Sequence, residues 1–174
     1  YSSVDADGHI VSPIYHEISN DVFKKIKDDS NFLFVDPQGF LRQKDSENNI
    51  VLKKTELDLT NVNAIKINPE EGKNIVDGTP DEMMLALQKK GIENVLLTDK
   101  TNVSLLVKDR IYSLKLPNKT VHDTTGIGDI FCSTFTCTML KEKDFLWALC
   151  FAAGSAQAAL ESNNVGLQKI PKKG

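Results

Sequence analysis

The chain has 174 residues, of which 40% are hydrophobic, and its 21 basic and 24 acidic side chains give a formal net charge of −3. This length suits about one domain with a sizeable core, and the composition excludes a disordered chain. The mildly acidic balance argues against nucleic acid or an anionic membrane surface as a partner. An anionic ligand would therefore need a local binding device. The first residue is Tyr1 rather than Met, which suggests a processed or truncated product.

The three cysteines, Cys132, Cys137 and Cys150, lie in apolar stretches and form no CxxC motif. An odd number of cysteines without such a motif predicts buried free thiols in a reducing compartment. The longest apolar stretch, residues 145–160, is too short for a membrane helix, and no signal peptide opens the chain. We therefore expect a cytoplasmic protein that does not enter a membrane.

Three short apolar runs have the pattern of buried strands: residues 32–35, 64–67 and 94–97. Each run ends at a side chain that carries oxygen, namely Asp36, Asn68 and Thr98. Helical patterns alternate with these runs, which predicts an α/β fold with a parallel sheet. Because ligands bind outside the carboxyl ends of such strands, we expect the three side chains along one rim. For Asp36, a cap at the end of the strand is the simpler alternative.

Further along the chain, Thr79-Pro80-Asp81-Glu82 has the N-cap, the first-turn proline and the capping-box glutamate of a helix start. Gly91 supplies the stop, so the sequence predicts a surface helix over residues 80–90. Residues 103–107 and 110–116 predict a β-hairpin. The polar segment 41–63 is harder to read, apart from a short strand near residues 50–52.

The last third of the chain predicts two apolar helices. In the first, Ile130, Phe131, Phe135 and Met139 share one helical face. The second covers residues 145–160, is rich in Ala and Gly, and is expected to place Trp147 in the core. The tail from Lys169 to Gly174 is expected to fray. No linker divides the chain, which predicts one domain over residues 1–174.

The segment Asp123-Thr124-Thr125-Gly126-Ile127-Gly128-Asp129 carries most of the chemical information. Two glycines let the backbone approach a ligand closely, and the helix that follows begins with unpaired N–H groups and the positive end of its dipole. Together they form an anion site for a phosphate or a developing negative charge. Asp129 in the first turn could accept a proton from a hydroxyl. The simpler alternative is a glycine turn with an aspartate that stabilises the helix N-terminus.

The motif DTTGIGDIF resembles the C-terminal signature of the ribokinase-like (PfkB-type) carbohydrate kinases, which is usually DTTGAGDAF. Residues 68–71 resemble the NxxE motif of that family, residues 36–42 its D-x-x-G/R stretch, and residues 151–160 its Ala-rich helix near the adenine site. The order and spacing agree over about residues 10–170. The resemblance implies a ribokinase-like three-layer α/β/α sandwich, present in part, as the nucleotide-binding and catalytic part of such a kinase.

The resemblance implies ATP-dependent phosphorylation of a hydroxyl on a sugar, a nucleoside or a related small molecule. Asp129 would be the catalytic base. The backbone N–H groups of Gly126, Ile127 and Gly128 would form the anion hole for the transferred phosphoryl group. Ile127 stands where the family usually has Ala, but its backbone N–H group is unchanged.

The same resemblance implies the cofactor sites. Asn68 and Glu71 would organise Mg²⁺ and the donor phosphates, Glu71 through water, although Glu71 could also be the solvated start of a helix. Thr98 would begin the loop that faces the nucleotide, and Ala153 would lie near the adenine. Two further residues match positions that bind a monovalent cation in some members of the family, and these are Asp123 and Thr125.

The chain departs from the family in the loop that begins at Thr98. That loop is commonly TxGxxG, whereas Lys100 and Val103 here replace both glycines, which predicts a less close approach of the backbone to adenosine. Lys100 would be either a solvated turn lysine or a contact to a phosphate. The three histidines are too scattered to predict a metal site: His9, His16 and His122.

Members of the family are about twice as long, and their N-terminal half supplies the acceptor site and a β-sheet lid. The missing strands would leave an exposed sheet edge and apolar surface, which favours self-association into a homo-oligomer. The second hypothesis is therefore a non-catalytic remnant or a fragment that binds nucleotide or a partner chain.

Overall fold

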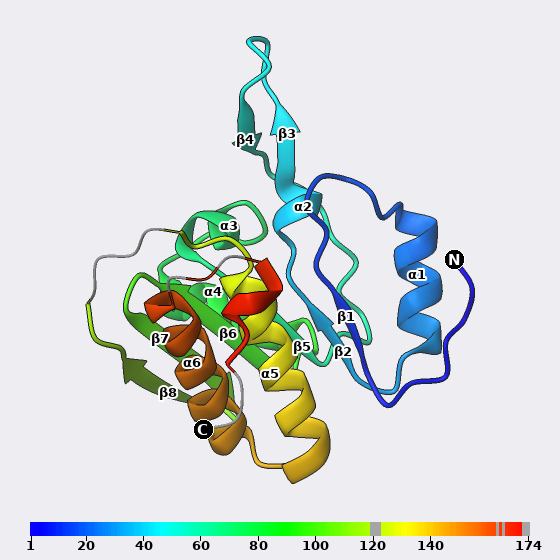
Figure 1. The fold of residues 1–174 in the computed structure, drawn as a ribbon. Helices are drawn as coiled ribbons and strands as arrows, with labels where there is room; N and C mark the ends of the chain where they lie inside the picture. Colours follow the sequence, from blue (N-terminus) through cyan, green and yellow to red (C-terminus); the bar gives the residue numbers. More distant parts are fainter. Residues whose placement is uncertain (119–122, 163, 165, 172–174) are drawn as a thin grey trace.

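The computed structural model describes residues 1–118, 123–162, 164 and 166–171. A six-stranded sheet in the order β1-β2-β5-β6-β7-β8 lies between two layers of helices (Figure 1). The first four strands of this order are parallel, and β7 and β8 continue the sheet as an antiparallel hairpin. The main sheet consists of β1 (His9–Val11), β2 (Leu33–Val35), β5 (Ala64–Ile67), β6 (Asn94–Asp99), β7 (Asn102–Val107) and β8 (Arg110–Lys115). The helices are α1 (Asn20–Asp29), α2 (Gln38–Leu41), α3 (Pro69–Lys73), α4 (Pro80–Lys89), α5 (Ile127–Glu142), α6 (Phe145–Glu161) and the 3₁₀ turn η1 (Gly166–Lys169).

Each face of the sheet has its own hydrophobic cluster because side chains alternate along a strand. In β2, Leu33 and Val35 belong to the cluster that includes α1 and α4. Phe34 belongs to the cluster with α5 and α6 and contacts Phe135, with ring centroids 5.7 Å apart. The three-layer α/β/α arrangement expected from the sequence is therefore confirmed.

The rim expected from the sequence is also present. Asp36 and Asn68 directly follow the neighbouring parallel strands β2 and β5, and Thr98 lies near the end of β6. The two even-numbered positions Lys66 and Thr98 point to the face that α5 and α6 cover, because Ala64 and Leu96 of the same strands belong to that cluster. This edge of the sheet therefore meets the first turn of α5.

The start of α4 follows the predicted capping box. The Glu82 carboxylate accepts a hydrogen bond from the Thr79 N–H group at 2.7 Å, and Thr79 Oγ1 accepts one from the Glu82 N–H group at 3.5 Å. The helix lies at the surface, but its inward face buries Met83, Met84 and Leu87. The hairpin of β7 and β8 and the two late helices were likewise correctly predicted.

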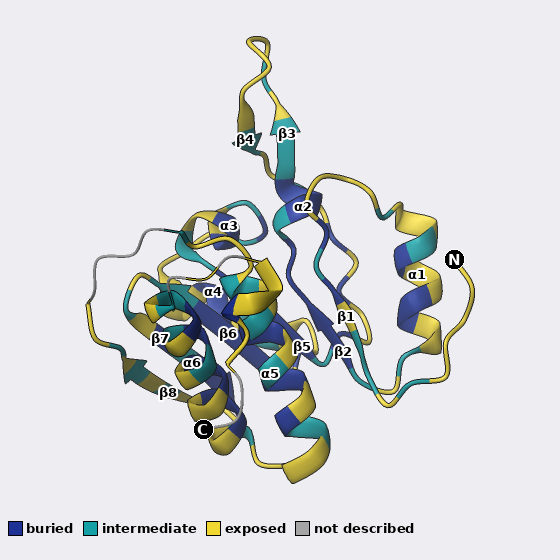
Figure 2. Cartoon of the chain, in the orientation of Figure 1, coloured by how far each residue is buried: buried dark blue, intermediate teal, exposed yellow. Residues whose placement is uncertain are grey.

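The polar segment after α2 forms a small two-stranded sheet of β3 (Arg42–Lys44) and β4 (Ile50–Leu52). Only the second of these strands was predicted. The pair projects away from the main sheet, and its outer end is exposed while its residues nearer the sheet are half-buried (Figures 1 and 2). Because no layer covers it, its side chains show no clear alternation of polar and apolar residues.

Several burial predictions were wrong. Trp147 is 55% exposed and stacks on Phe151 along the outer face of α6. Cys132 is buried as expected, and burial raises the pKa of its thiol, but Cys137 and Cys150 are exposed. In an apolar helix, which residues face the sheet depends on tertiary packing, and the composition of α5 and α6 gives little contrast between faces. None of the helices in the described residues combines the length and hydrophobicity needed to cross a bilayer.

A pair of glycine substitutions tests the packing of α2 against the chain before α1. A Cβ atom at Gly39 would lie 2.3 Å from the carbonyl carbon and oxygen of Pro13, whereas one at Gly154 in α6 would meet nothing within 4 Å. We expect Gly39→Ala to lower the free energy of unfolding by about 1–3 kcal/mol. Gly154→Ala should leave it unchanged or raise it by up to about 1 kcal/mol. Urea denaturation measures both, and equal effects would contradict the close backbone contact.

Candidate functional site

The first turn of α5 lies between two pockets, which we name after a residue in each. The Asp129 pocket has a volume of about 460 Å³, and the Lys66 pocket has a volume of about 260 Å³. The Asp129 pocket is lined by Thr125, Gly126, Asp129, Ile130, Ser133, Thr134, Gly166, Leu167 and Ile170. The Lys66 pocket is lined by Lys66, Thr98, Lys100, Val103, Leu116, Thr124, Ile127, Gly128, Phe131, Ala153, Ala156 and Leu160. Helical periodicity places the α5 residues of the two linings on opposite sides of the first turn.

The Lys66 pocket has polar groups at one end and apolar walls elsewhere. Lys66 and Thr98 come from the ends of β5 and β6, and Gly128 comes from α5. The apolar walls come from β7, the segment after β8, and the facing sides of α5 and α6. Such a pocket can hold an anionic group beside the ammonium and a flat apolar group against the alanines of α6.

Lys66 is the buried cation of this pocket. Its Nζ forms an ion pair with Oδ2 of Asp36, and their side chains are 11% and 7% exposed. Burial alone would lower the pKa of Lys66, but the charge of Asp36 and its hydrogen bond raise the pKa above its usual value. Lys66 therefore stays protonated next to Gly128, where an added Cβ would lie 3.3 Å from Nζ.

Sequence reasoning missed Lys66. The signal was a lysine inside a four-residue run predicted to be a buried strand, since a charged residue in such a place requires a partner. Asp36, which the sequence left as a possible strand cap, is that partner. Asp36 also caps the start of α2, because its Oδ1 accepts a hydrogen bond from the Gln38 N–H group at 3.3 Å.

Asn68 and Glu71 form the capping box of α3. Oδ1 of Asn68 accepts hydrogen bonds from the N–H groups of Glu70 at 2.9 Å and Glu71 at 2.8 Å. Oε2 of Glu71 accepts one from the Asn68 N–H group at 2.9 Å, and Gln38 donates to Oε1 at 3.4 Å. Glu71 is only 1% exposed, and its burial raises the pKa of the carboxyl group. Neither residue lines the Lys66 pocket.

These contacts do not fit a direct Mg²⁺ site. The oxygens that would bind the ion are engaged by backbone and amide N–H groups, and Mg²⁺ needs a regular set of oxygen ligands. Among the described residues, no group of three His, Cys, Asp or Glu side chains is arranged to hold a metal ion. His122, considered above, lies outside the described residues.

Asp129 stands in the first turn of α5 and is exposed in its pocket. Its Oδ1 accepts a hydrogen bond from Ser12 Oγ at 2.9 Å, so a residue far away in the sequence holds the carboxylate. Gly126 caps the helix with φ of 78°, a left-handed conformation that favours glycine. The Ile127 N–H group makes a long hydrogen bond of 3.3 Å to the Thr124 carbonyl, which a stronger acceptor such as phosphate could replace.

Asp123 and Thr125 lie together, as the predicted cation site requires, but the side chain of Lys169 binds to both of them. Lys169 Nζ donates to Oδ2 of Asp123 at 2.6 Å, to the Asp123 carbonyl at 3.0 Å and to the Thr125 carbonyl at 3.2 Å. The hydrogen bond from Lys169 keeps the pKa of Asp123 well below its usual range. The prediction of a frayed tail was wrong at this residue, since Lys169 is only 3% exposed.

The remaining predicted residues, Thr98, Lys100 and Ala153, all line the Lys66 pocket. Lys100 lies in the tight turn between β6 and β7, with φ of 54°. The residue is exposed, and it also lines a smaller neighbouring pocket of about 230 Å³. Lys100 thus stands where either of its predicted roles is feasible.

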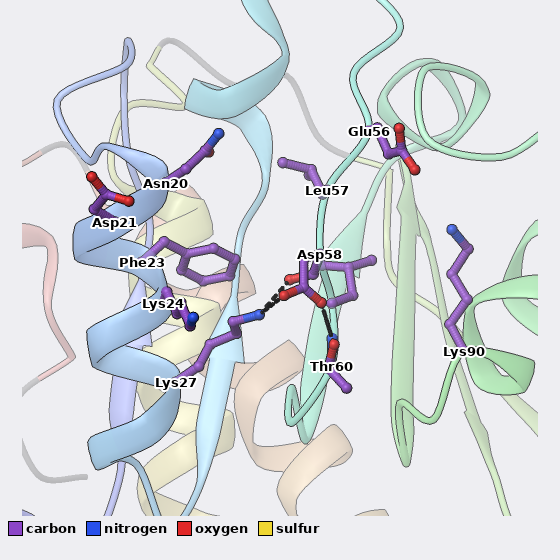
Figure 3. Close-up of a pocket in the computed structure, with 11 residues that line it drawn as sticks. Asn20, Asp21, Phe23, Lys24, Lys27, Glu56, Leu57, Asp58, Thr60 and Lys90 are labelled. Atoms are coloured by element: carbon purple, nitrogen blue, oxygen red, sulfur yellow. Dashed lines mark hydrogen bonds and ion pairs between the residues drawn. The ribbon is translucent and has the colours of Figure 1, made fainter.

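The largest of the described pockets lies elsewhere, between α1 and the segment before β5 (Figure 3). Its volume is about 680 Å³, and Lys27 and Asp58 form an ion pair at its centre. Hydrogen bonds from Lys27 and Thr60 keep the pKa of Asp58 below its usual range. Lys27, Asp58 and Thr60 thus bind one another, and the other charged residues that line the pocket lie around this ion pair.

Comparisons with known proteins agree with the observed fold. The family model for pfkB family carbohydrate kinases matches residues 38–173. A variant of a pyrophosphate-dependent myo-inositol-1 kinase has a TM-score of 0.82 and 20% identity, with 92% of this chain and 60% of that chain covered. An Escherichia coli protein assigned as ribokinase II, solved with ATP and Mg²⁺, has a TM-score of 0.63 and 18% identity, with 82% and 47% covered.

A third structure, a double mutant of Vibrio cholerae fructokinase with fructose, ADP and potassium bound, has a TM-score of 0.68 and 14% identity. It is matched over 92% of this chain and 56% of that chain. A comparison with curated proteins finds no match. The chain spans about 60% or less of the length of each of these three kinases.

The three-layer arrangement of helices and strands is the ribokinase-like fold. Because the family model covers most of the chain, this protein belongs to the PfkB family of carbohydrate kinases.

Lys66→Met tests the buried ion pair. It would leave the Asp36 carboxylate buried without its cation, so we expect the free energy of unfolding to fall by about 3–5 kcal/mol. The control is Lys54→Met, since Lys54 and Asp77 form an exposed ion pair whose loss should cost less than about 1 kcal/mol. Urea denaturation measures both variants. The double change Lys66→Met, Asp36→Leu should recover much of the loss, and no recovery would show that the pairing is not the cause.

Proposed function

We propose that this chain carries the donor-binding and proton-transfer part of an ATP-dependent kinase. Its acceptor is a hydroxyl of a sugar, a nucleoside or a related small molecule. The observation that carries the proposal is the placement of Asp129 and Lys66 on opposite sides of the first turn of α5. A phosphoryl group at that turn would have a base on one side and a cation on the other.

The chemistry follows from the two pockets. The acceptor hydroxyl would lie in the Asp129 pocket, where the carboxylate held by Ser12 removes its proton during attack. The donor would lie in the Lys66 pocket, with its phosphates near the ammonium and its base against Ala153. The N–H groups of Gly126, Ile127 and Gly128 would stabilise charge on the transferred phosphoryl group. Mg²⁺ would enter with the donor phosphates rather than through direct protein ligands.

Pyrophosphate is the alternative donor. The apolar walls of the Lys66 pocket favour a nucleotide, because pyrophosphate has no apolar part to cover them. Two lysines in the lining of this pocket, Lys66 and Lys100, together with the likeness to a pyrophosphate-dependent kinase, favour the smaller donor. A calorimetric titration of the chain with ATP, ADP and pyrophosphate, each with and without Mg²⁺, decides between them.

We expect Mg²⁺-dependent binding of ATP in that titration. Tighter binding of pyrophosphate than of ATP would reassign the donor, and binding of neither would contradict the donor site.

A second candidate is a protein that binds nucleotide or a partner chain without catalysis. It is favoured by the open wall of the Asp129 pocket, where Leu167 is 85% and Ile170 48% exposed. Donor binding without turnover of any sugar, nucleoside or polyol tested would support this candidate. The exposed apolar residues are also consistent with the self-association expected from the sequence.

Asp129→Asn tests the catalytic role. Replacing a carboxylate that acts as general base should lower the rate of phosphoryl transfer by about 10²–10⁴ and leave donor affinity nearly unchanged. The matched control is Asp109→Asn in the exposed turn between β7 and β8, which should change neither quantity. Donor consumption with a panel of polyols and sugars measures the rate, and calorimetry measures affinity. A loss of donor binding together with turnover would contradict the role of a base.

A further inference from the structure

The position that the sequence assigned to a monovalent cation holds a side chain of the same protein. Lys169 Nζ donates to three oxygens, at 2.6, 3.0 and 3.2 Å, and the lysine side chain is only 2% exposed. A lysine ammonium has three N–H groups, so these contacts use all of its donors. The ammonium carries a single compact charge, as K⁺ does, and its three partners are oxygens of the kind that K⁺ prefers.

We infer that the Lys169 ammonium replaces the monovalent metal cation in this chain, so that residues 123–125 are held before α5 without potassium. A metal ion cannot share the three oxygens with the ammonium, since two cations at such distances repel strongly when shielded from water.

Lys169 is a positioning residue for the anion-binding turn. The Asp123 carboxylate that it binds also accepts a hydrogen bond from the Thr125 N–H group, through Oδ1 at 2.9 Å. The loop is thereby held directly before Gly126, the residue that caps α5. Lys169 also ends η1, whose residues Gly166 and Leu167 line the Asp129 pocket. One ammonium thus joins the anion-binding loop to a wall of the neighbouring pocket.

The first test is thermal unfolding in KCl and in choline chloride at equal ionic strength. The wild-type chain should have the same Tm in both salts, because its cation is covalently attached. Lys169→Ala should lower the Tm in choline chloride, and K⁺ should then restore more than half of that loss in a saturable way. Lys25→Ala is the matched control, because Lys25 is an exposed lysine of α1, on the other face of the sheet, and its loss should produce no response specific to K⁺.

Two outcomes would overturn the inference. In one, K⁺ but not choline raises the Tm of the wild-type chain in a saturable way, and by as much as K⁺ raises the Tm of Lys169→Ala. The other is a loss of stability in Lys169→Ala that K⁺ and choline leave equally uncorrected, since Lys169 would then be an ion pair at a site that selects no cation.

A second measurement needs no variant, in case Lys169→Ala does not fold. The wild-type chain should bind ATP, in the presence of Mg²⁺, with equal affinity in KCl and in choline chloride. A difference in the ATP affinity of tenfold or more between the two salts would overturn the inference. This arm rests on the proposed function, whereas the thermal arm does not. Absence of donor binding in every salt would therefore count against the proposed function alone.

Discussion

The burial of one ammonium group constrains much of the surrounding structure. Lys66 belongs to a strand whose other residues are apolar, so its charge must find a partner within the protein. Asp36 provides that partner from the adjacent strand, which fixes the ends of β2 and β5 relative to each other. The helix that passes over the pair must come close without covering the ammonium, and Gly128 allows this because it has no side chain.

The same strand ends show that one residue pattern can serve two purposes. Asn68 and Glu71 were singled out as organisers of Mg²⁺, and they form a reciprocal capping box with little exposure. A capping box and a phosphate site need the same residue types, since both place oxygens next to backbone N–H groups. In this chain the box fixes the start of α3 beside Gln38, and the role of Asn68 and Glu71 in organising Mg²⁺ stays a prediction.

Local signals made most of the fold predictable from the sequence. The strands that end at Asp36, Asn68 and Thr98, the capping box at Thr79 and the glycine turn before α5 each depend on residues close together in the chain. The contacts that the sequence did not reveal join distant residues: Ser12 with Asp129, Lys66 with Asp36, and Lys169 with Asp123 across 46 positions. Pattern and propensity carry no information on such pairs, and the three-residue strand β1 was too short for its periodicity to show.

The Lys66 pocket has one more property, which concerns inheritance. Every residue that lines it falls between positions 66 and 160, whereas the Asp129 carboxylate is held by Ser12, and its pocket is closed by residues 166–170. A contiguous stretch of chain can be copied or recombined as a unit, but the Lys66 pocket also needs Asp36 as the partner of Lys66, so residues 36–160 are the shortest stretch that carries the whole pocket. The Asp129 pocket joins residues from Ser12 to Ile170, so no shorter stretch of the chain carries all of it. The two pockets therefore differ in how readily each could pass from one chain to another as a single unit.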